Sequence, residues 1–206
     1  MILVGQYDSP YTRRVAVSLH MLGFAFEHDT RSVFGDFDSM RRTNPLGRIP
    51  SLVLEDGEVL IDSVAILDWL DQTVGPGRAL LPAAGKPRRR ALQLVALASG
   101  AVDKAGAAAY ERIIRPKAYR WPDWIARCRT QAEGALAALE GHDWPVSARL
   151  DQPAITTACM LRYVQMTDPD LLGDRYPRLA HLSQRCEAMP EFRATYPPDV
   201  VYPRND

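Results

Sequence analysis

The stretch Ser-Pro-Tyr-Thr at residues 9–12 has the spacing of a C-x-x-C redox loop, with hydroxyls where the two sulfurs would be. A dithiol in such a turn exchanges disulfides through a reactive thiolate, which Ser9 and Thr12 cannot do. A hydroxyl there can cap the helix that follows, or it can donate a hydrogen bond to a sulfur. Either this turn has lost its chemistry, or the sulfur is supplied by another molecule.

Two further polar stretches could act with this turn. Arg48, Ile49 and Pro50 stand at the entrance to a predicted strand, where proline is tolerated. A cis bond before Pro50 would turn the Ile49 backbone toward the first turn. Asp62 and Ser63 end a strand and open a helix, so their ordinary role is to cap that helix. The same geometry suits a ligand that ends in an α-amino acid group. Its carboxylate would bind Ser63 and the free N–H groups at the helix start, and its ammonium would lie beside Asp62.

Hydrophobic periodicity predicts the elements that position these residues. Helical stripes, short apolar runs and an Asp-Gly hairpin signal alternate along the first 77 residues in the order β-α-β-α-β-β-α. The expected elements are a strand at 2–4, a helix from Pro10 to a stop at Gly23, a half-buried strand at 24–28, a short helix or loop over 32–48, a hairpin around Asp56-Gly57, and a helix over 64–74. The N-terminal part is therefore an α/β domain.

The second half of the chain has only helical patterns, with prolines near three helix starts at residues 122, 153 and 177. The apolar stripes run over about 92–114, 125–139, 155–166 and 179–189. Asp151 is the expected cap of one helix, although Ala154 stands where the reciprocal acid of a capping box would be. We predict domains at 1–79 and 87–206, the second an all-α helical bundle, joined by a linker at 80–86.

Composition excludes several classes of function. The 25 basic and 25 acidic residues balance, so no overall field attracts nucleic acid or an anionic membrane. No apolar stretch approaches the roughly 20 residues of a membrane helix, and no signal peptide opens the chain, which favours the cytoplasm. Cys128, Cys159 and Cys186 form no C-x-x-C and lie in helical stripes, so we expect reduced core thiols and no metal site.

Taken together, the motifs point to a family. The order S-P-Y-x-x-R-V, NPLGRIPSL and LIDSVAILDWL, followed by an all-helical half, resembles the bacterial glutathione transferases over nearly the whole chain. The resemblance extends to RPKAYRWPDWIARCRTQAEGALAALE and LSQRCEAMPEFRATYP. It implies a thioredoxin-like N-terminal domain, an all-helical C-terminal domain, a homodimer, and glutathione as co-substrate in the cleft between the domains.

The resemblance also assigns roles to residues. Asp62 and Ser63 would hold the γ-glutamyl end of glutathione. Ile49, before a cis Pro50, would pair its backbone with the cysteinyl unit, and Arg48 would lie near the glycyl carboxylate.

Ser9 matches the position whose hydroxyl faces the glutathione sulfur, so the sulfur missing from the turn arrives with the co-substrate. Ser9 would stabilise the thiolate as a hydrogen-bond donor, while Tyr7 stays open as an alternative donor. The thiolate would attack a small, apolar electrophile by conjugation, dehalogenation or peroxide reduction, as in detoxification. Candidates for the electrophile site, which could equally serve packing between domains, are Tyr11, Tyr110, Arg112 and Trp121. The alternative function is a non-catalytic ligand carrier or dimerisation scaffold.

Overall fold

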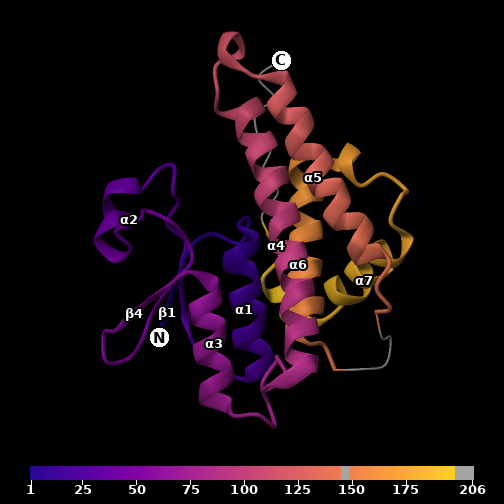
Figure 1. Ribbon diagram of the computed structural model, residues 1–206. Helices are drawn as coiled ribbons and strands as arrows, with labels where there is room; N and C mark the ends of the chain where they lie inside the picture. Colours follow the sequence, from indigo (N-terminus) through magenta and orange to yellow (C-terminus); the bar gives the residue numbers. More distant parts are fainter. Residues whose placement is uncertain (145–148, 198–206) are drawn as a thin grey trace. The chain divides into compact units, whose positions relative to one another are not determined.

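The computed structural model describes residues 1–144 and 149–197 (Figure 1). Contacts divide the chain into two compact units, Met1–Arg88 with the described residues from 188 onward, and Arg89–Glu187. The elements are β1 (Ile2–Val4), α1 (Pro10–Leu22), β2 (Glu27–Asp29), α2 (Phe37–Thr43), β3 (Ser51–Val53), β4 (Val59–Ile61), α3 (Ser63–Val74), α4 (Gly85–Ile113), η1 (Lys117–Tyr119), α5 (Pro122–Glu140), α6 (Gln152–Thr167), η2 (Pro169–Leu171), α7 (Pro177–Glu187) and α8 (Pro190–Ala194).

The first unit is built on a four-stranded mixed sheet with the strand order β2-β1-β3-β4. β1 and β2 are parallel and are joined through α1, whereas β3 pairs antiparallel with β1 and with β4. Helices α1 and α3 pack on each other and on the sheet, and Figure 1 shows them side by side. The unit has the predicted thioredoxin-like α/β fold.

Helix α1 is the central helix of this unit. Every residue from Thr12 to Leu19 is buried, including polar ones. The helix ends as predicted at Gly23, whose left-handed backbone (φ 78°) lets its N–H bond to the last carbonyls of the helix. The predicted hairpin and the helix ending before Gly75 are also confirmed.

The second strand lies further along the chain than the alternation at 24–28 predicts. The strand comprises Glu27–Asp29 instead. The N–H of Phe24 bonds to Leu19 O at the end of α1, and the Phe24 ring packs against Trp69 of α3. The aromatic alternation therefore reflects packing on helices, because an aromatic side chain buries large apolar area in either setting.

The C-terminal helix α8 packs on α1 in the first unit. The buried guanidinium of Arg13 donates to Thr195 O at 3.0 Å and to Phe192 O at 3.1 Å, and it lies over the Phe192 ring. Residues 188–197, part of the second predicted domain, thus group with the first unit by their contacts. The predicted linker at 80–86 stays a prediction.

The second unit consists of helices around α6, in which every residue from Gln152 to Leu161 is buried. Helix α7 packs on α6 and on α5. Prolines lie at or next to the first residue of α5, α6 and α7 as predicted, and Asp151 caps α6 through Ala154 N. All three cysteines are free and buried, as expected. Among the described residues, no helix has the length and apolar character needed to cross a membrane.

A buried carboxylate joins three helices of this unit. Asp168, at the end of α6, is 5% exposed. It accepts hydrogen bonds from Arg112 of α4 at 3.1 Å and from Arg129 of α5. Arg112 also donates to Thr167 O. Asp168 is therefore an ion-pair centre that joins the C-terminal ends of α4 and α6 to the middle of α5.

Candidate functional site

Strand register brings the three polar stretches of the first unit to one end of the sheet. Val4 of β1 pairs with Ser51 of β3, and Ser51 pairs in turn with Ile61 of β4. The segment after β1, the segment before β3 and the segment after β4 therefore begin in one row across the sheet. These segments carry Ser9, the Arg48-Ile49-Pro50 stretch and the Asp62-Ser63 pair.

Ser9 is the N-cap residue of α1, with extended backbone dihedrals and Pro10 at the first helical position. Its Oγ accepts a hydrogen bond from Thr12 N at 3.3 Å. Since a hydroxyl has one proton and two lone pairs, this contact uses a lone pair and leaves the proton available for donation. Ser9 thus serves as a helix cap and keeps the capacity to donate that its predicted role requires.

The segment before β3 approaches the β1–α1 connection closely. The Ile49–Pro50 peptide bond is cis. A Cβ on Gly5 would lie 2.8 Å from the Ile49 Cβ and 2.7 Å from Thr12 Oγ1, so only glycine leaves room there, and its φ of 132° is one that glycine tolerates. Gly5 therefore permits Ile49 to sit against the start of α1.

A buried asparagine orders the loop before Ile49. Asn44 donates through Nδ2 to Arg48 O at 2.8 Å and accepts at Oδ1 from Leu46 N at 3.0 Å. The side chain of Arg48 is exposed. The loop thus fixes the Arg48 backbone while its guanidinium remains accessible to an anion.

Asp62 and Ser63 form the start of α3. Asp62 has φ 70° and ψ 136°, and it is the one non-glycine residue with positive φ among those the structure describes. Such a conformation costs about 1 to 3 kcal/mol and is found preferentially at functional sites. Its Oδ1 accepts from Val64 N at 2.9 Å, and a carboxylate has further lone pairs for an ammonium.

Ser63 is linked to α1 by a buried arginine. Its Oγ accepts a hydrogen bond of 2.6 Å from Nη2 of Arg14, and both side chains are almost fully buried. The Arg14 guanidinium also lies over the Tyr11 ring, 5.4 Å from its centroid. Two of the predicted segments, the start of α1 and the start of α3, are therefore joined through Arg14.

Two hydroxyls in this region have no hydrogen-bond partner among the residues that the structure describes. They are Thr12 Oγ1 and Ser51 Oγ, both fully buried. Buried polar atoms are ordinarily paired, and exceptions call for a reason such as a functional site. The end of the sheet thus combines close backbone approach, one strained residue and incompletely paired hydroxyls.

Known proteins match both the unit and the whole chain. Residues 3–78 match the family model of the glutathione S-transferase N-terminal domain. The GST-like protein YibF of Escherichia coli (strain K12) is 31% identical over 204 residues, which cover 96% of this chain and 99% of that protein. This chain belongs to the glutathione S-transferase family.

Solved structures and a further relative agree with that membership. A glutathione transferase family member from Pseudomonas fluorescens Pf-5, solved with bound glutathione, has a TM-score of 0.86 and 36% identity, with 96% of this chain and 98% of that chain covered. The maleylacetoacetate isomerase of Pseudomonas aeruginosa is 25% identical over 209 residues, and 96% of each chain is covered.

In this transferase-family protein the alternative donor, Tyr7, packs against β2. Its ring stacks on His28 with centroids 3.9 Å apart, and His28 Nε2 lies 2.7 Å from Gly5 O. Burial raises the pKa of Tyr7 to about 12. Burial disfavours the phenolate, so Tyr7 keeps its proton at neutral pH and stays an alternative donor.

The candidate electrophile residues of the second unit differ in exposure and in their contacts. Arg112 is engaged with Asp168 and Thr167. Tyr110 and Trp121 are exposed. Arg112 therefore has a structural role in the second unit, which accounts for its presence without an electrophile.

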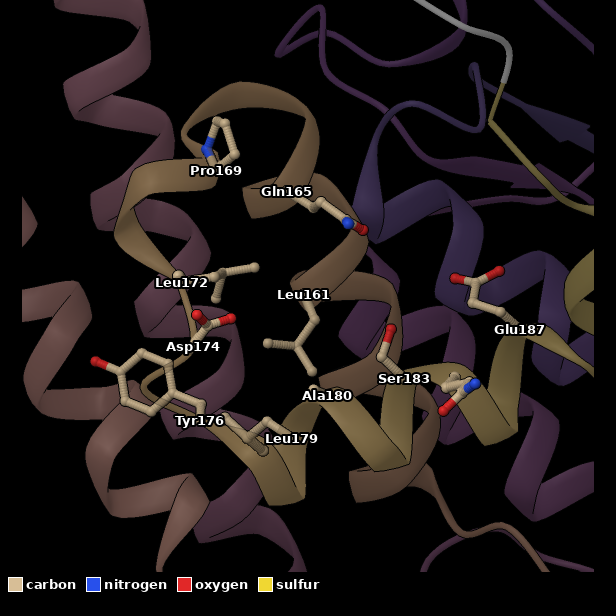
Figure 2. A pocket seen from close by; sticks show the side chains of 12 residues that line it. Leu161, Gln165, Pro169, Leu172, Asp174, Tyr176, Leu179, Ala180, Ser183 and Glu187 are labelled. Carbon is tan, nitrogen blue, oxygen red and sulfur yellow. The ribbon is translucent and has the colours of Figure 1, made fainter.

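The second unit has a cavity of about 450 Å³ of its own between α6, η2 and α7 (Figure 2). Figure 2 shows the Leu161 and Leu172 side chains directed into the same space, with Gln165 and Ser183 at its edge. None of the residues predicted to bind glutathione lines this cavity.

Sequence reasoning missed Arg14, Gly5 and Asn44. Arg14 lies off the apolar stripe of the predicted helix at 10–22, so periodicity gave no signal that it is buried and paired. Gly5 directly follows a strand, which is typical of close backbone approach. Asn44 before Pro45 is a turn signal.

Proposed function

We propose that this protein is a glutathione transferase in which Ser9 stabilises the thiolate of bound glutathione for attack on a small apolar electrophile. The observation that carries the proposal is the meeting of the Ser9 turn, Ile49–Pro50 and Asp62–Ser63 at one end of the sheet. Asp62 and Ser63 would hold the γ-glutamyl end. The Ile49 backbone beside Pro50 would pair with the cysteinyl unit.

The polar groups are suited to these contacts. Asp62 offers a carboxylate to the glutamyl ammonium, and the Ser63 hydroxyl can donate to the adjacent carboxylate. The exposed guanidinium of Arg48 can pair with the glycyl carboxylate, and in an exposed setting such a pair contributes about 0 to 1 kcal/mol. We therefore assign most of the binding energy to the γ-glutamyl and cysteinyl contacts.

The expected lowering of the glutathione thiol pKa supports the role of Ser9. A free thiol has a pKa of about 8.5, so that only a few per cent is thiolate at neutral pH. A hydrogen bond to a charged group contributes about 1.5 to 3 kcal/mol, which corresponds to a pKa lower by roughly one to two units. The positive end of α1 adds about 0.3 to 1 kcal/mol. Thiolate then becomes a major species at neutral pH.

In the transferase reaction the thiolate sulfur attacks the carbon that bears a leaving group. The C–S bond forms as the bond to the leaving group breaks, and the leaving group departs with the electron pair. The thiol proton has already passed to solvent. Ser9 takes no covalent part, because its hydroxyl stabilises charge on sulfur.

The test is a Ser9→Ala variant assayed with glutathione and a panel of alkyl halides, nitroaryl halides and hydroperoxides. We expect the rate at pH 7 to fall about 10- to 100-fold and the rate–pH profile to move up by about one to two units. Ser9→Thr should restore part of the rate, and Tyr7→Phe should retain it. An unchanged rate–pH profile in Ser9→Ala would exclude the donor role. Tight glutathione binding without turnover in the parent protein would favour a ligand carrier.

A second candidate reaction is glutathione-dependent isomerisation, which the similarity to maleylacetoacetate isomerase favours. There the thiolate would add to a carbon–carbon double bond conjugated to a carbonyl, the former double bond would rotate, and the thiolate would leave again. Titration of free thiol separates the two reactions, because transfer consumes glutathione and isomerisation returns it.

We also propose a homodimer, which the resemblance implies, located in the cytoplasm. Large exposed apolar side chains on the first unit, among them Phe34, Leu46 and Val64, are consistent with a contact surface. Sedimentation equilibrium and cell fractionation test these two properties.

A further inference from the structure

Two neighbouring arginines of α1 are buried to the same degree and reach different partners. Arg13 and Arg14 are each 1% exposed. Arg13 donates to the backbone carbonyls of Thr195 and Phe192 near α8, whereas Arg14 donates to Ser63 Oγ at the start of α3. Arginine is almost never fully buried unless it is paired, so each contact needs an explanation. The contact of Arg13 explains how α8 is held.

The contact with Arg14 determines whether the Ser63 hydroxyl acts as a donor or an acceptor toward other groups. A guanidinium can only donate hydrogen bonds, so Ser63 Oγ accepts from Arg14 with one of its lone pairs. The hydroxyl proton must then point to a different acceptor. At 2.6 Å the bond is short, as expected when the donor is charged, and such bonds are about twice as strong as neutral ones. The Arg14 guanidinium therefore makes Ser63 a better donor.

Ser63 lies just beneath the surface of the unit. It is 2% exposed, while Asp62 before it and Val64 after it are exposed. A carboxylate that approaches the start of α3 from solvent would be a suitable acceptor for this proton. The acceptor would also lie near the positive charge of Arg14. Because Arg14 is buried, solvent screens its charge less than it screens an exposed charge.

We propose that Arg14 is a positioning residue that fixes the Ser63 hydroxyl as a donor to the carboxylate of the γ-glutamyl end of glutathione. The inference rests on the proposed function, and it concerns one carboxylate of the ligand. Arg14 thereby contributes to selectivity for a ligand that carries this group, and it leaves the chemistry at sulfur to other residues.

The experiment compares two ligands by titration calorimetry. One is glutathione, and the other is 4-aminobutyryl-cysteinyl-glycine, which lacks the α-carboxylate of the glutamyl residue. The parent protein should bind glutathione more tightly. In Arg14→Met, which removes the guanidinium and keeps an apolar stem, the ratio of the two affinities should fall about 10- to 100-fold. Arg14→Lys keeps a donor and should retain part of the ratio, which also covers failure of the methionine variant to fold.

The matched control is Arg13→Met on the same helix. It loses the contacts to Thr195 and Phe192, so its melting temperature should fall while its affinity ratio stays that of the parent. A double-mutant cycle with Ser63→Ala completes the test. If Arg14 acts through Ser63, Arg14→Met should lower the ratio little further in the Ser63→Ala background.

Three outcomes would overturn the proposal. They are an equal loss of affinity for both ligands in Arg14→Met, the same change of ratio in Arg13→Met, and fully additive losses in the cycle. Failure of the proposed function is distinguishable. Without a glutathione site the parent protein would bind neither ligand, and without transferase chemistry it would bind glutathione with the same ratio of affinities but show no turnover.

Discussion

In the first unit, a buried guanidinium and several hydroxyls lie at one end of the sheet, whereas in the second unit a buried carboxylate at the end of α6 lies between two guanidiniums from α4 and α5. The first region also contains a residue with strained backbone and a glycine that no larger residue can replace without displacement. The second contains regular helices. Buried polar groups thus gather at the proposed binding site in one unit and join helices in the other.

The two regions also differ in how far the cost of burying polar groups is offset by pairing. Asp168 has charged partners on two helices, so its burial is compensated inside the protein. At the end of the sheet, Asp62 is held in a costly conformation, and Thr12 Oγ1 and Ser51 Oγ have no partner among the described residues. Strain and incomplete pairing persist where the surrounding structure fixes them and function uses them. Changes at Asp168 should therefore affect stability alone, whereas changes at the end of the sheet should affect glutathione binding as well.

The largest effect is expected from Gly5→Ala. A Cβ there would lie within 2.8 Å of both Thr12 Oγ1 and Ile49 Cβ, at a φ that L-residues rarely adopt. The clash and the backbone strain together should lower the free energy of unfolding by about 3 to 5 kcal/mol and displace Ile49. Urea denaturation and glutathione titration measure the two losses.

The matched substitution in the second unit is Gly134→Ala in α5. An added Cβ meets nothing within 4 Å there, and the residue lies inside a helix. It should therefore stabilise the protein by up to about 1 kcal/mol. Equal effects of the two substitutions would contradict the distinction between the regions.

Asp168→Ala is expected to have the next largest effect, on stability alone. The substitution leaves two guanidiniums without their carboxylate, which costs about 3 to 5 kcal/mol for a fully buried pair. Because both arginines are about 30% exposed, we expect about 2 to 3 kcal/mol in urea denaturation. Glutathione affinity should be retained.

The control for Asp168 is its exposed neighbour Asp170, whose change to alanine should alter stability by less than about 0.5 kcal/mol. A loss of glutathione affinity in Asp168→Ala, without a loss of stability, would show that this ion-pair centre serves the ligand.

Local signals made much of the fold predictable. Gly23 ends α1 because glycine adopts the left-handed backbone without cost, and Asp56-Gly57 turns the hairpin for a related reason. The strand at 27–29 was misplaced to 24–28 because Phe24 and Phe26 alternate as in a strand, while their rings pack on Trp69 and His20 of helices.

Contacts between distant residues were not predictable. The hydrogen bond from Arg14 spans 49 positions, and that from Arg13 to Thr195 spans 182. Both arginines belong to one short sequence and one helix, so periodicity alone cannot tell which partner each reaches. The candidate site residues came from motifs at the ends of predicted strands, whereas the residues that support them became visible only through packing.

The smallest predicted effect concerns the pH dependence of the first unit. Burial raises the pKa of Asp29, but hydrogen bonds and the charge of Arg31 lower it by more, so that the net shift is downward from 3.8. Arg31 also donates to Ser39 O and Thr43 Oγ1 and thus ties α2 to the end of β2. A carboxylate with a lowered pKa stabilises the fold above its ordinary pKa, and this contribution is lost as the pH falls through the lowered value.

In Asp29→Asn, the free energy of unfolding should therefore fall less steeply than in the parent below about pH 4. The loss at pH 7 should stay below about 1 kcal/mol, because the pair is partly exposed. Urea denaturation between about pH 2.5 and pH 7 measures both quantities. Arg31→Gln should give the same shallow dependence of the free energy of unfolding on pH, since it removes the other partner. Equal dependence on pH in the parent and in Asp29→Asn would show that protonation of this carboxylate does not affect stability.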